Sequence, residues 1–509
     1  MGRMSATTRT SPVDDARAEA SVEADAPELD ATEVDAPGVD APGVDAPEAA
    51  TAHPELLGIA AELREAVLGG TTRPRAWREA QLDGVARMLL QNVSLWERAL
   101  ADDLGKSALE AHLTEIGYTA AEARRAKRSL RRWMAPTPVA APLALQPAVA
   151  RTVAEPLGVA LIIAPWNYPL QLALAPLIGA LAAGDAAVVK PSEVAPATSR
   201  LLAQLIPAYL DERAVRVVEG DAAATTTLLA ERWDLIFYTG NGRVARIVAE
   251  AAAKHLTPTI LELGGKSPVY VHRSADIPAA ARRIAWGKWL NAGQTCVAPD
   301  HVLVDREVAG QLVEELRVAT AEQLGEARDS DDFGRIVTAR HAERLRDLLP
   351  GGTAVTGGDV DVRARYVAPT ILVDVDESSD LMQEEIFGPL LPVLPIDGVD
   401  AFVRRMRGLE KPLALYVFAR DGEAIRRVER ETTSGGLGIN VTVAHVGSAA
   451  LPFGGVGESG SGAYHGRHSF EAFSHRKAVL SKPTALDTLR LVYPPIPAGR
   501  RDLIRRILG

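Results

Sequence analysis

The chain contains one cysteine, Cys296, among its 509 residues. A lone cysteine cannot form a disulfide within the chain, so it is either a small buried apolar residue or a nucleophile. Its neighbours Gly293, Gln294 and Thr295 are poor core-forming residues, and they lie between a segment with helical spacing and a strand-like segment. The local sequence alone leaves both interpretations open.

A glutamate, Glu262, stands within the apolar strand that we predict over residues 259–263. Burial of a carboxylate is costly and raises its pKa, which would make Glu262 usable as a general base. The alternative is an ion pair between Glu262 and a nearby lysine or arginine. Both readings require the strand to be placed in a fold.

The segment from Glu155 onward alternates between short apolar strands and helices. Strands are predicted over 159–164, 186–189, 215–219 and 235–238, and helices over 170–183, 196–211, 221–232 and 243–255. This alternation predicts βαβ units, with a parallel sheet covered by helices on both faces. Ligands bind such sheets at the carboxyl ends of the strands.

Polar residues gather at these strand ends. Trp166 and Asn167 follow the first strand, Lys190 and Glu193 the second, and residues 239–242 the fourth. The lysine and glutamate could bind ribose hydroxyls, or they could form an exposed pair at a helix start.

The residues after the fourth strand, Gly240, Asn241 and Gly242, with Ala245 three positions on, match the pattern G-x-G-x-x-A. The glycines would let a phosphate approach the backbone at a helix N-terminus. A simple turn with a helix cap is the alternative, but four consecutive βα units favour a dinucleotide site.

A second α/β region follows. It is predicted from strands over 259–263, 302–305, 413–418 and 438–441 and helices over 275–291, 307–324 and 422–432. Helices are also predicted over 54–68, 73–104 and 106–133. Residues 137–153 are extended and interrupted by prolines, which predicts a hairpin or arm. Residues 451–466 form a glycine-rich loop that is too long for a simple linker.

The charge of the chain is concentrated at its start. Residues 1–50 hold twelve acidic residues and three arginines, so −9 of the net charge of −10 lies there. Residues 1–52 also repeat the unit Val-Asp-Ala-Pro-Gly and have no aromatic residue, which predicts a disordered acidic tail. The remaining body, near −1, gives no electrostatic case for nucleic acid or an anionic membrane surface.

The composition, with 47% hydrophobic and 24% charged residues, is that of a soluble globular protein. No apolar run approaches the roughly 20 residues of a membrane span, so we expect no membrane anchor. One cysteine and no apolar signal segment predict a cytoplasmic location.

Two other motifs are set aside. Residues 265–267 resemble the end of a phosphate-binding P-loop, but Ile260 stands where its first glycine is required. His465 and His468 have a possible metal spacing, but without companion ligands we expect surface residues and no metal.

Taken together, the motifs resemble the aldehyde dehydrogenase superfamily, and most of all its class 3 branch of fatty, aromatic and coniferyl-type enzymes. The likeness runs from about residue 55 to about residue 480. The motifs that carry it are residues 155–159, 165–169 (Pro-Trp-Asn-Tyr-Pro), 190–193 (Lys-Pro-Ser-Glu), 251–258, 262–268, 293–296 (Gly-Gln-Thr-Cys), 384–389 (Glu-Glu-Ile-Phe-Gly-Pro) and 451–457.

The resemblance implies a reaction at Cys296, which would attack the aldehyde carbon. The Asn167 side-chain amide and the Cys296 backbone N–H would hold the oxyanion, and hydride would pass to NAD or NADP. Glu262 would then activate the water that releases a carboxylic acid. We expect the partly exposed, polar loop to give Cys296 thiolate character.

The resemblance also implies the cofactor residues. Lys190 and Glu193 would hold the adenine-side ribose, Glu385 the nicotinamide ribose, and Phe387 would pack near the nicotinamide. The full cofactor set is Trp166, Lys190, Glu193, Thr239, Gly240, Asn241, Gly242, Leu263, Gly264, Glu385 and Phe387. The chain departs from the family at Gly242, where a hydroxyl residue is usual, and at Ala245, where glycine is common; this could alter pyrophosphate binding.

The family fold implies several parts. They are a dinucleotide-binding domain (53–136 and 158–263), a catalytic domain (264–437), a bridging domain (137–157 and 438–485) that joins the partner in a homodimer, and a C-terminal tail (486–509). Because no arginine cluster lies near Cys296 in the sequence, we expect medium- to long-chain aliphatic or aromatic aldehydes rather than semialdehydes. A CoA-acylating enzyme, against which Glu262 argues, and a non-catalytic protein on the same fold are the alternatives.

Overall fold

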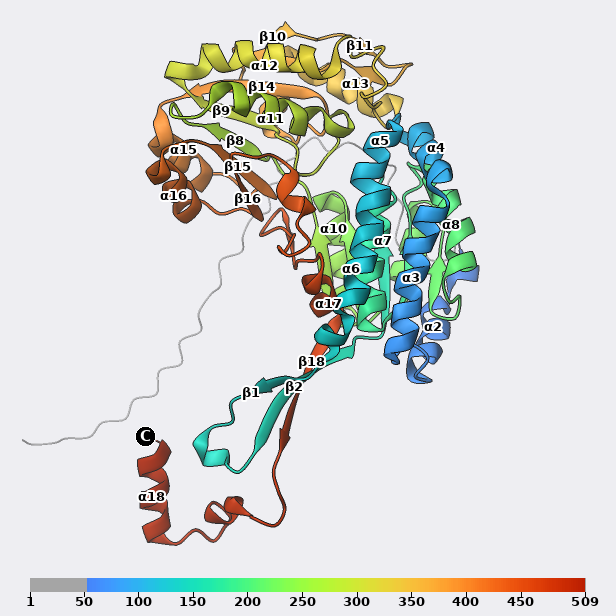
Figure 1. Cartoon of the computed structure of the whole chain (residues 1–509), viewed down its shortest axis with the longest axis vertical. Helices are drawn as coiled ribbons and strands as arrows, with labels where there is room; N and C mark the ends of the chain where they lie inside the picture. Colours follow the sequence, from blue (N-terminus) through green and yellow to red (C-terminus); the bar gives the residue numbers. More distant parts are fainter. Residues whose placement is uncertain (1–52, 509) are drawn as a thin grey trace, which may run out of the picture. The chain divides into compact units, whose positions relative to one another are not determined.

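The structure, a computed structural model, describes residues 53–508 (Figure 1). The acidic segment that we expect to be disordered, residues 1–52, lies outside the described residues. The described chain forms two large sheets, a three-stranded sheet and a two-stranded sheet. Most neighbouring strands of the two large sheets are parallel, and helices connect them, so the predicted α/β fold class is confirmed.

The first large sheet has six strands in the order β17-β7-β6-β3-β4-β5. These are β3 (Val159–Ile163), β4 (Ala186–Lys190), β5 (Val215–Val217), β6 (Leu235–Thr239), β7 (Thr259–Glu262) and β17 (Gly460–Ser461). The connecting helices are α7 (Gln171–Ala183), α8 (Pro196–Tyr209), α9 (Ala222–Leu229) and α10 (Gly242–Ala253). All strands from β3 to β7 are parallel, as predicted, whereas β17 pairs antiparallel with β7.

Strand β3 shows why its sequence is an unbroken apolar run. Ala160 and Ile162 face one hydrophobic core, whereas Leu161 and Ile163 face another on the opposite side of the sheet. Helices therefore cover both faces, and Figure 1 shows α3, α6 and α7 side by side on one of them.

The N-terminal helices pack against this sheet. They are η1 (Pro54–Leu56), α2 (Ile59–Leu68), α3 (Arg75–Gln91), α4 (Val93–Leu104), α5 (Ala108–Ala111), a π-helical turn η2 (His112–Ile116) and α6 (Gly117–Met134). The prediction of one helix over 73–104 is wrong because the chain breaks at Asn92. The Asn92 side-chain amide donates to the Met88 carbonyl at 2.8 Å, which satisfies an acceptor at the end of α3.

The second large sheet has seven strands in the order β10-β13-β14-β9-β8-β15-β16. These are β8 (Pro268–Val271), β9 (His301–Asp305), β10 (Thr353–Thr356), β13 (Thr370–Val373), β14 (Leu390–Ile396), β15 (Ala414–Phe418) and β16 (Gly436–Ile439). Its helices are α11 (Ile277–Trp289), η4 (Leu290–Gly293), η5 (Arg306–Val308), α12 (Ala309–Leu324), α13 (Ala339–Leu348), η6 (Leu349–Gly351), α14 (Asp380–Gln383), α15 (Gly398–Arg407) and α16 (Gly422–Glu431). Strands β11 (Val360–Asp361) and β12 (Tyr366–Val367) form the two-stranded sheet.

Strand β14 was not predicted from the sequence. It contains Pro392 and Pro395, and proline normally argues against a central strand because it has no N–H to donate. In the structure β14 nevertheless lies between β13 and β9 and is parallel to both. Its position is fixed by burial of its apolar side chains, of which the residues from 390 to 394 are all buried.

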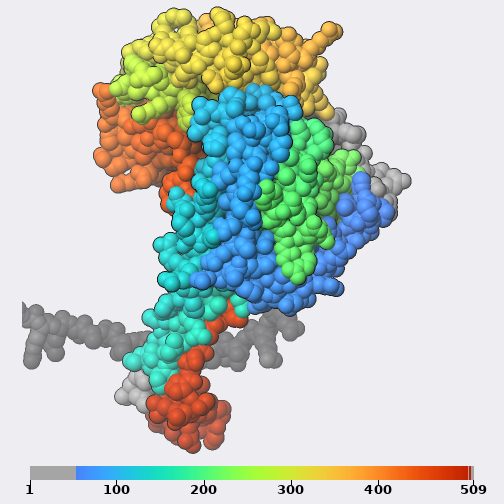
Figure 2. All heavy atoms as spheres, turned by 45° about the vertical axis from the view of Figure 1, so that its right-hand side comes forward, coloured from blue at the N-terminus to red at the C-terminus, as the bar shows by residue number. Residues whose placement is uncertain are grey.

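Residues 137–156 form the extended arm that the prolines predicted. Strands β1 (Thr137–Val139) and β2 (Val149–Pro156) pair with β18 (Ser474–Ser481) in the order β1-β2-β18, all antiparallel. The short helix η3 (Leu143–Leu145) connects β1 and β2, and α17 (Arg467–Ala472) precedes β18. In Figure 2 the turquoise residues of this arm lie beside red residues of the C-terminal segment.

The C-terminal segment, which we expected to be a mixed tail, contains η8 (Thr488–Leu491) and α18 (Ala498–Leu508). It contacts the arm, because Lys482 Nζ and Thr488 Oγ1 both bond to residues 145–147. Throughout residues 53–508, no helix combines the length and apolar character needed to cross a membrane.

The glycine-rich loop over 451–466 contributes strand β17, which pairs Gly460 with Glu262. Gly460 has φ of 133°, and a Cβ there would lie 2.1 Å from the Leu261 carbonyl oxygen. A side chain at this position would therefore separate β17 from β7 and uncover the strand that carries Glu262.

The substitution Gly460→Ala should lower the free energy of unfolding by about 1–3 kcal/mol, because it combines backbone strain with a clash. Urea denaturation followed by circular dichroism would measure the change. Gly499→Ala is the control, since a Cβ at Gly499 meets nothing within 4 Å. Equal stability of the two variants would contradict the assigned role of Gly460.

Candidate active site

Cys296 lies in the loop that connects η4 to β9. Asn291 and Ala292, which precede Cys296 by five and four positions, have φ of 52° and 50°. This backbone conformation costs roughly 1–3 kcal/mol at non-glycine residues. Hydrogen bonds hold this loop: Glu110 accepts from the Asn291 N–H at 2.9 Å, and the Val337 N–H donates to Gln294 Oε1 at 2.9 Å. The cysteine is thus presented by a fixed backbone.

Asn167, four residues after the end of β3, joins the first sheet to this loop. Its side-chain amide donates to the Gln294 carbonyl at 3.0 Å, and Asn291 Nδ2 donates to the Asn167 carbonyl at 2.8 Å. The hydroxyls of Tyr168 and Thr295 are also hydrogen bonded, at 2.7 Å. Because a primary amide has two N–H groups, the bond to Gln294 leaves the second one for another acceptor.

Glu262 is the last residue of β7 and is buried. Among the described residues neither of its carboxylate oxygens has a hydrogen-bond partner, so the ion pair considered from the sequence does not form. Burial raises the pKa of this carboxyl well above its usual value, as we expected for a buried glutamate.

The thiol of Cys296 is half-buried, and its pKa is raised to about 12. The largest cause is desolvation, followed by the negative charges of Glu385 and Glu262; the backbone N–H groups of Cys296 and Val297 oppose the rise. Desolvation and the charges of these two carboxylates therefore oppose the thiolate character that we expected of Cys296. Because the charges of Glu385 and Glu262 influence the thiol pKa, both carboxylates lie within electrostatic range of the sulfur.

Glu385 precedes Phe387 in the loop between α14 and β14 and lies against the end of β7. A Cβ at Gly264 would lie 2.1 Å from Glu385 Oε2, so only glycine permits this approach. Desolvation and then Asp300 raise the pKa of Glu385 to about 8. Lys266 Nζ lies 2.7 Å from Asp300 Oδ1, and the Ile386 N–H donates to Asp300 Oδ2 at 2.9 Å, which ties this loop to the cysteine loop.

Aromatic rings lie beside Glu385, where Phe387 of the same loop contacts Trp166. The rings of Trp166 and Phe387 meet edge to face with centroids 5.3 Å apart, and Trp166 also contacts His341 at 5.1 Å. Phe387 has φ of 48°. Leu263, directly after Glu262, is buried and its N–H donates to the Ser459 carbonyl at 3.2 Å.

The remaining predicted cofactor residues lie at the ends of β4 and β6. Lys190 Nζ is 2.8 Å from Glu193 Oε2, and this pair joins a buried lysine to an exposed glutamate. The Glu193 carboxylate is open to a ligand, so the geometry is compatible with binding of ribose hydroxyls as well as with an exposed pair at a helix start.

At the end of β6, the Gly240 N–H donates to the Glu262 carbonyl at 3.0 Å. Asn241 caps α10, accepting from the Val244 N–H at 3.0 Å, and Gly242 is the first residue of this helix. Thr239 Oγ1 is enclosed and has no partner among the described residues. A helix N-terminus, an unpaired hydroxyl and the glycine at 264 fit a dinucleotide placed across the strand ends.

Several buried charged residues near this site were not found from the sequence. Lys106, Glu110 and Glu115 come from the segment between α4 and α6, far from Cys296 in the sequence, and all three are buried. In the sequence, these three residues have the spacing and charges of an ordinary solvent-exposed helix face, so nothing indicated that they are buried near the site.

The expectation that His465 is a surface residue is wrong. It is buried, and its ring is stacked on Phe453 with centroids 5.2 Å apart. Burial lowers its pKa to about 4, so the ring is neutral at pH 7. No group of three or more potential ligands within residues 53–508 is placed to hold a metal.

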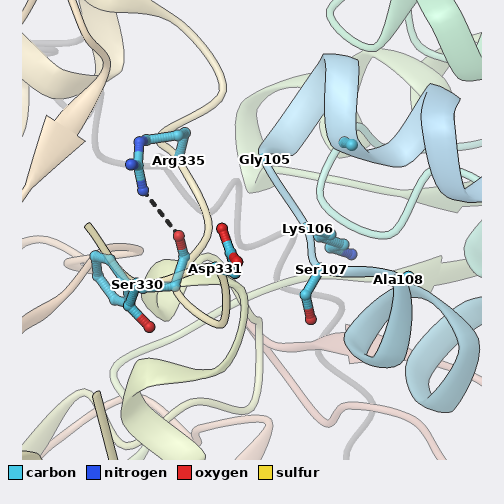
Figure 3. A pocket seen from close by; sticks show the side chains of 9 residues that line it. Gly105, Lys106, Ser107, Ala108, Ser330, Asp331 and Arg335 are labelled. Carbon is cyan, nitrogen blue, oxygen red and sulfur yellow. Dashed lines mark hydrogen bonds between the residues drawn. The ribbon is translucent and has the colours of Figure 1, made fainter. Parts of the chain in front are cut away.

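A cavity of about 520 Å³ lies beside the α4–α5 loop. Figure 3 shows residues 105–108 on one side of it and Ser330, Asp331 and Arg335 on the other. Arg335 is held by the Phe333 carbonyl at 2.8 Å. None of the predicted site residues lines this cavity.

A parallel sheet whose strand ends fit a dinucleotide, together with a second α/β unit that presents a cysteine, is typical of nicotinamide-dependent dehydrogenases. The model of the aldehyde dehydrogenase family matches residues 53–479, and the chain belongs to this family. It is therefore an enzyme that oxidises aldehydes with NAD or NADP.

Known relatives support the same assignment. The chain is 47% identical over 445 residues to aldehyde dehydrogenase family 3 member B1 of Bos taurus, covering 87% of this chain and 95% of that protein. It is 46% identical over 437 residues to the dimeric NADP-preferring aldehyde dehydrogenase of Rattus norvegicus, covering 86% and 96%. The substrate-bound state of Staphylococcus aureus AldH has a TM-score of 0.85 and 40% identity, covering 88% and 98%. The predicted resemblance is thus confirmed.

The raised pKa of Glu262 predicts a pH-dependent stability. Above pH 4.5, the usual value, the unfolded chain loses this proton while the folded chain keeps it, so the contribution of Glu262 to stability falls as pH rises. Glu262→Gln should therefore gain stability relative to the natural protein, by up to about 1.4 kcal/mol per pH unit above pH 4.5 until the folded-state pKa is reached.

Urea denaturation of both proteins between pH 5 and pH 9 would measure this difference. Gln323→Ala, an exposed substitution that removes no titratable group, is the control, for which the difference should stay constant with pH. A difference for Glu262→Gln that does not grow with pH would mean that the carboxyl is ionised in the folded protein.

Proposed function

We propose that Cys296, Asn167 and Glu262 carry out the aldehyde oxidation. The observation that supports this most strongly is the meeting of three groups from separate segments. The Asn167 amide is bonded to the cysteine loop, and the unpartnered Glu262 influences the pKa of the Cys296 thiol. Each group has the chemistry that one step requires.

In the first step, the sulfur of Cys296 forms a bond to the aldehyde carbon while the thiol proton leaves. This proton leaves to solvent water, so the Glu262 carboxylate is kept for the later hydrolysis step. The aldehyde oxygen becomes an oxyanion, which accepts hydrogen bonds from the second Asn167 N–H and the Cys296 backbone N–H. One such donor is worth about 3–4 kcal/mol of transition-state stabilisation.

Bound NAD or NADP supplies the hydride acceptor, and loss of hydride from the adduct leaves a thioester on Cys296. The residues at 239–242, Lys190, Glu193, Gly264 and Glu385 would bind the dinucleotide, with Trp166, Leu263 and Phe387 forming apolar walls. Glu262 then takes a proton from water as the water oxygen attacks the thioester carbon. The acid product leaves and the Cys296 thiol is regenerated.

The substrate we propose is a neutral medium- to long-chain aliphatic or aromatic aldehyde. No arginine cluster lies near Cys296 in the sequence. The second carboxylate of a semialdehyde substrate would therefore lack a cationic partner.

Two substitutions test these roles. Cys296→Ser should abolish reduction of NAD or NADP with an aldehyde such as benzaldehyde, because a hydroxyl is a much weaker nucleophile. Glu262→Gln should give one rapid burst of reduced cofactor and then stall, since the thioester forms more readily than it is hydrolysed. Absorbance of the reduced nicotinamide in a rapid-mixing experiment measures both.

Glu458→Gln, an exposed substitution, is the matched control and should turn over as the natural protein does. Steady turnover by Glu262→Gln would show that another base hydrolyses the thioester. Addition of CoA that restores turnover of the stalled variant, without hydrolysis, would instead favour the CoA-acylating alternative.

We also propose the predicted organisation into a dinucleotide-binding domain (53–136 and 158–263), a catalytic domain (264–437) and a bridging domain (137–157 and 438–485). We further propose a homodimer joined through the arm. Leu143 and Leu480 on the arm are 88% and 50% exposed, and β18 has a partner on one edge only within the described chain. Unpaired edges and exposed leucines favour association with a second copy. A cytoplasmic location fits the single reduced cysteine.

Sedimentation velocity tests this dimer. The double substitution Leu143→Asp/Leu480→Asp should convert the dimer to a monomer, because two charges would be buried in the interface. Leu256→Asp, at a residue that is 92% exposed, should leave the dimer intact. A monomeric natural protein, or a dimeric double variant, would contradict the proposed interface.

A further inference from the structure

A buried ion pair lies behind the loop that carries Asn167. Lys106 Nζ is 2.5 Å from Glu115 Oε1, and neither side chain has any exposed surface. Lys106 belongs to the α4–α5 loop and Glu115 to the π-helical turn η2. A buried pair of this kind seldom stabilises a fold more than apolar residues would, so its contacts indicate what it does.

Those contacts all reach one short segment after β3. Lys106 Nζ donates to the Asn167 carbonyl at 3.1 Å and lies 3.9 Å from the centroid of the Tyr168 ring. Glu115 Oε2 accepts from the N–H groups of Leu170 and Gln171 at 2.9 and 3.1 Å, at the start of α7. The pair therefore fixes the backbone at both ends of residues 167–171.

We propose that Lys106 and Glu115 are positioning residues, which hold Asn167 where its side-chain amide donates to the oxyanion of the reaction. The proposal rests on the role of Asn167 in the proposed function. Lys106 and Asn291 both donate to the Asn167 carbonyl, and Asn291 also donates to the Gln294 carbonyl that receives the Asn167 amide. The amide is thereby held at its backbone and at its tip.

The precision of this arrangement matters because an oxyanion donor contributes only at hydrogen-bond distance from the developing charge. A displacement of about 1 Å can cost on the order of a hundredfold in rate. Without Lys106, the Asn167 carbonyl would keep one donor, and the segment could rotate about the bond to Asn291. A π-helical turn such as η2 is itself common at functional sites.

The test uses the full-length enzyme with saturating NADP and benzaldehyde. Lys106→Met removes the donor, Glu115→Gln keeps the shape and removes the charge, and the combined variant removes both charges of the pair. The combined variant keeps the test valid if either single variant fails to fold. Each should lower the burst rate of reduced cofactor about tenfold or more, with cofactor Kd changed less than about twofold.

A double-mutant cycle separates positioning from a structural role. If the pair acts through Asn167, then adding Lys106→Met/Glu115→Gln to Asn167→Ala should lower the burst rate by less than about twofold further. If the pair only stabilises the fold in general, the fold-reductions in burst rate caused by Lys106→Met/Glu115→Gln and by Asn167→Ala should instead multiply.

Arg78→Met is the matched control, because Arg78 is a buried cation of α3 that contacts the C-terminal end of α7, opposite to the end that Glu115 contacts. Its guanidinium donates to the Ala182 carbonyl at 3.1 Å and to the Thr72 carbonyl at 3.3 Å. This variant should lower the melting temperature but leave the burst rate of the folded enzyme within about twofold of the natural rate.

The outcomes are distinguishable. A normal burst rate in the combined variant, or full multiplication of its effect with that of Asn167→Ala, would overturn the positioning role while leaving the proposed function intact. If Asn167→Ala alone leaves the burst unchanged, the role of Asn167 in the proposed function fails first. A tenfold loss that disappears in the Asn167→Ala background supports the proposal.

Discussion

The hydrogen bond from the Asn167 amide to the Gln294 carbonyl is the contact on which the site depends. Asn167 lies in the loop that follows β3 of the first sheet, and Gln294 lies two residues before Cys296 in the second α/β unit. The bond between them fixes the proposed oxyanion donor relative to the proposed nucleophile. The left-handed backbone at Asn291 and Ala292 is then understandable, because it brings the Gln294 carbonyl to the amide.

The second constraint is the desolvation of charge. Glu262, Glu385 and the Cys296 thiol all have raised pKa values, and desolvation by burial is the largest cause for each of them. The raised pKa of the thiol favours its neutral form. Such a site avoids the cost of a buried thiolate and leaves ionisation to be coupled to the reaction.

The folding of the chain places its distant segments around this site. The glycine-rich loop returns as β17 beside β7 and covers Glu262, and β18 returns beside β2 to complete the arm. Strands β17 and β18 thus pair with strands that precede them in the sequence by about two hundred residues or more. The C-terminal part thus contributes to the cleft and to the proposed dimer interface alike.

Much of the site could be predicted from the sequence. The lone Cys296, the glutamate inside an apolar strand and the polar residues after consecutive strands each carry a local signal, and βα alternation places strand ends on one edge of a sheet. Strand β14 could not be predicted because its prolines argue against a central strand, and only burial on both sides places it there.

Local sequence determined which residue types are available: one thiol, one buried carboxylate in β7, and a glycine at 264 that admits Glu385. Tertiary structure alone decided their chemical state and support. It buried the Cys296 thiol near two carboxylates, and desolvation, followed by the charges of Glu385 and Glu262, raises the thiol pKa. It also brought Lys106 and Glu115 beneath Asn167. These effects depend on distances between residues far apart in the chain, and electrostatic energies and hydrogen bonds follow those distances rather than sequence order.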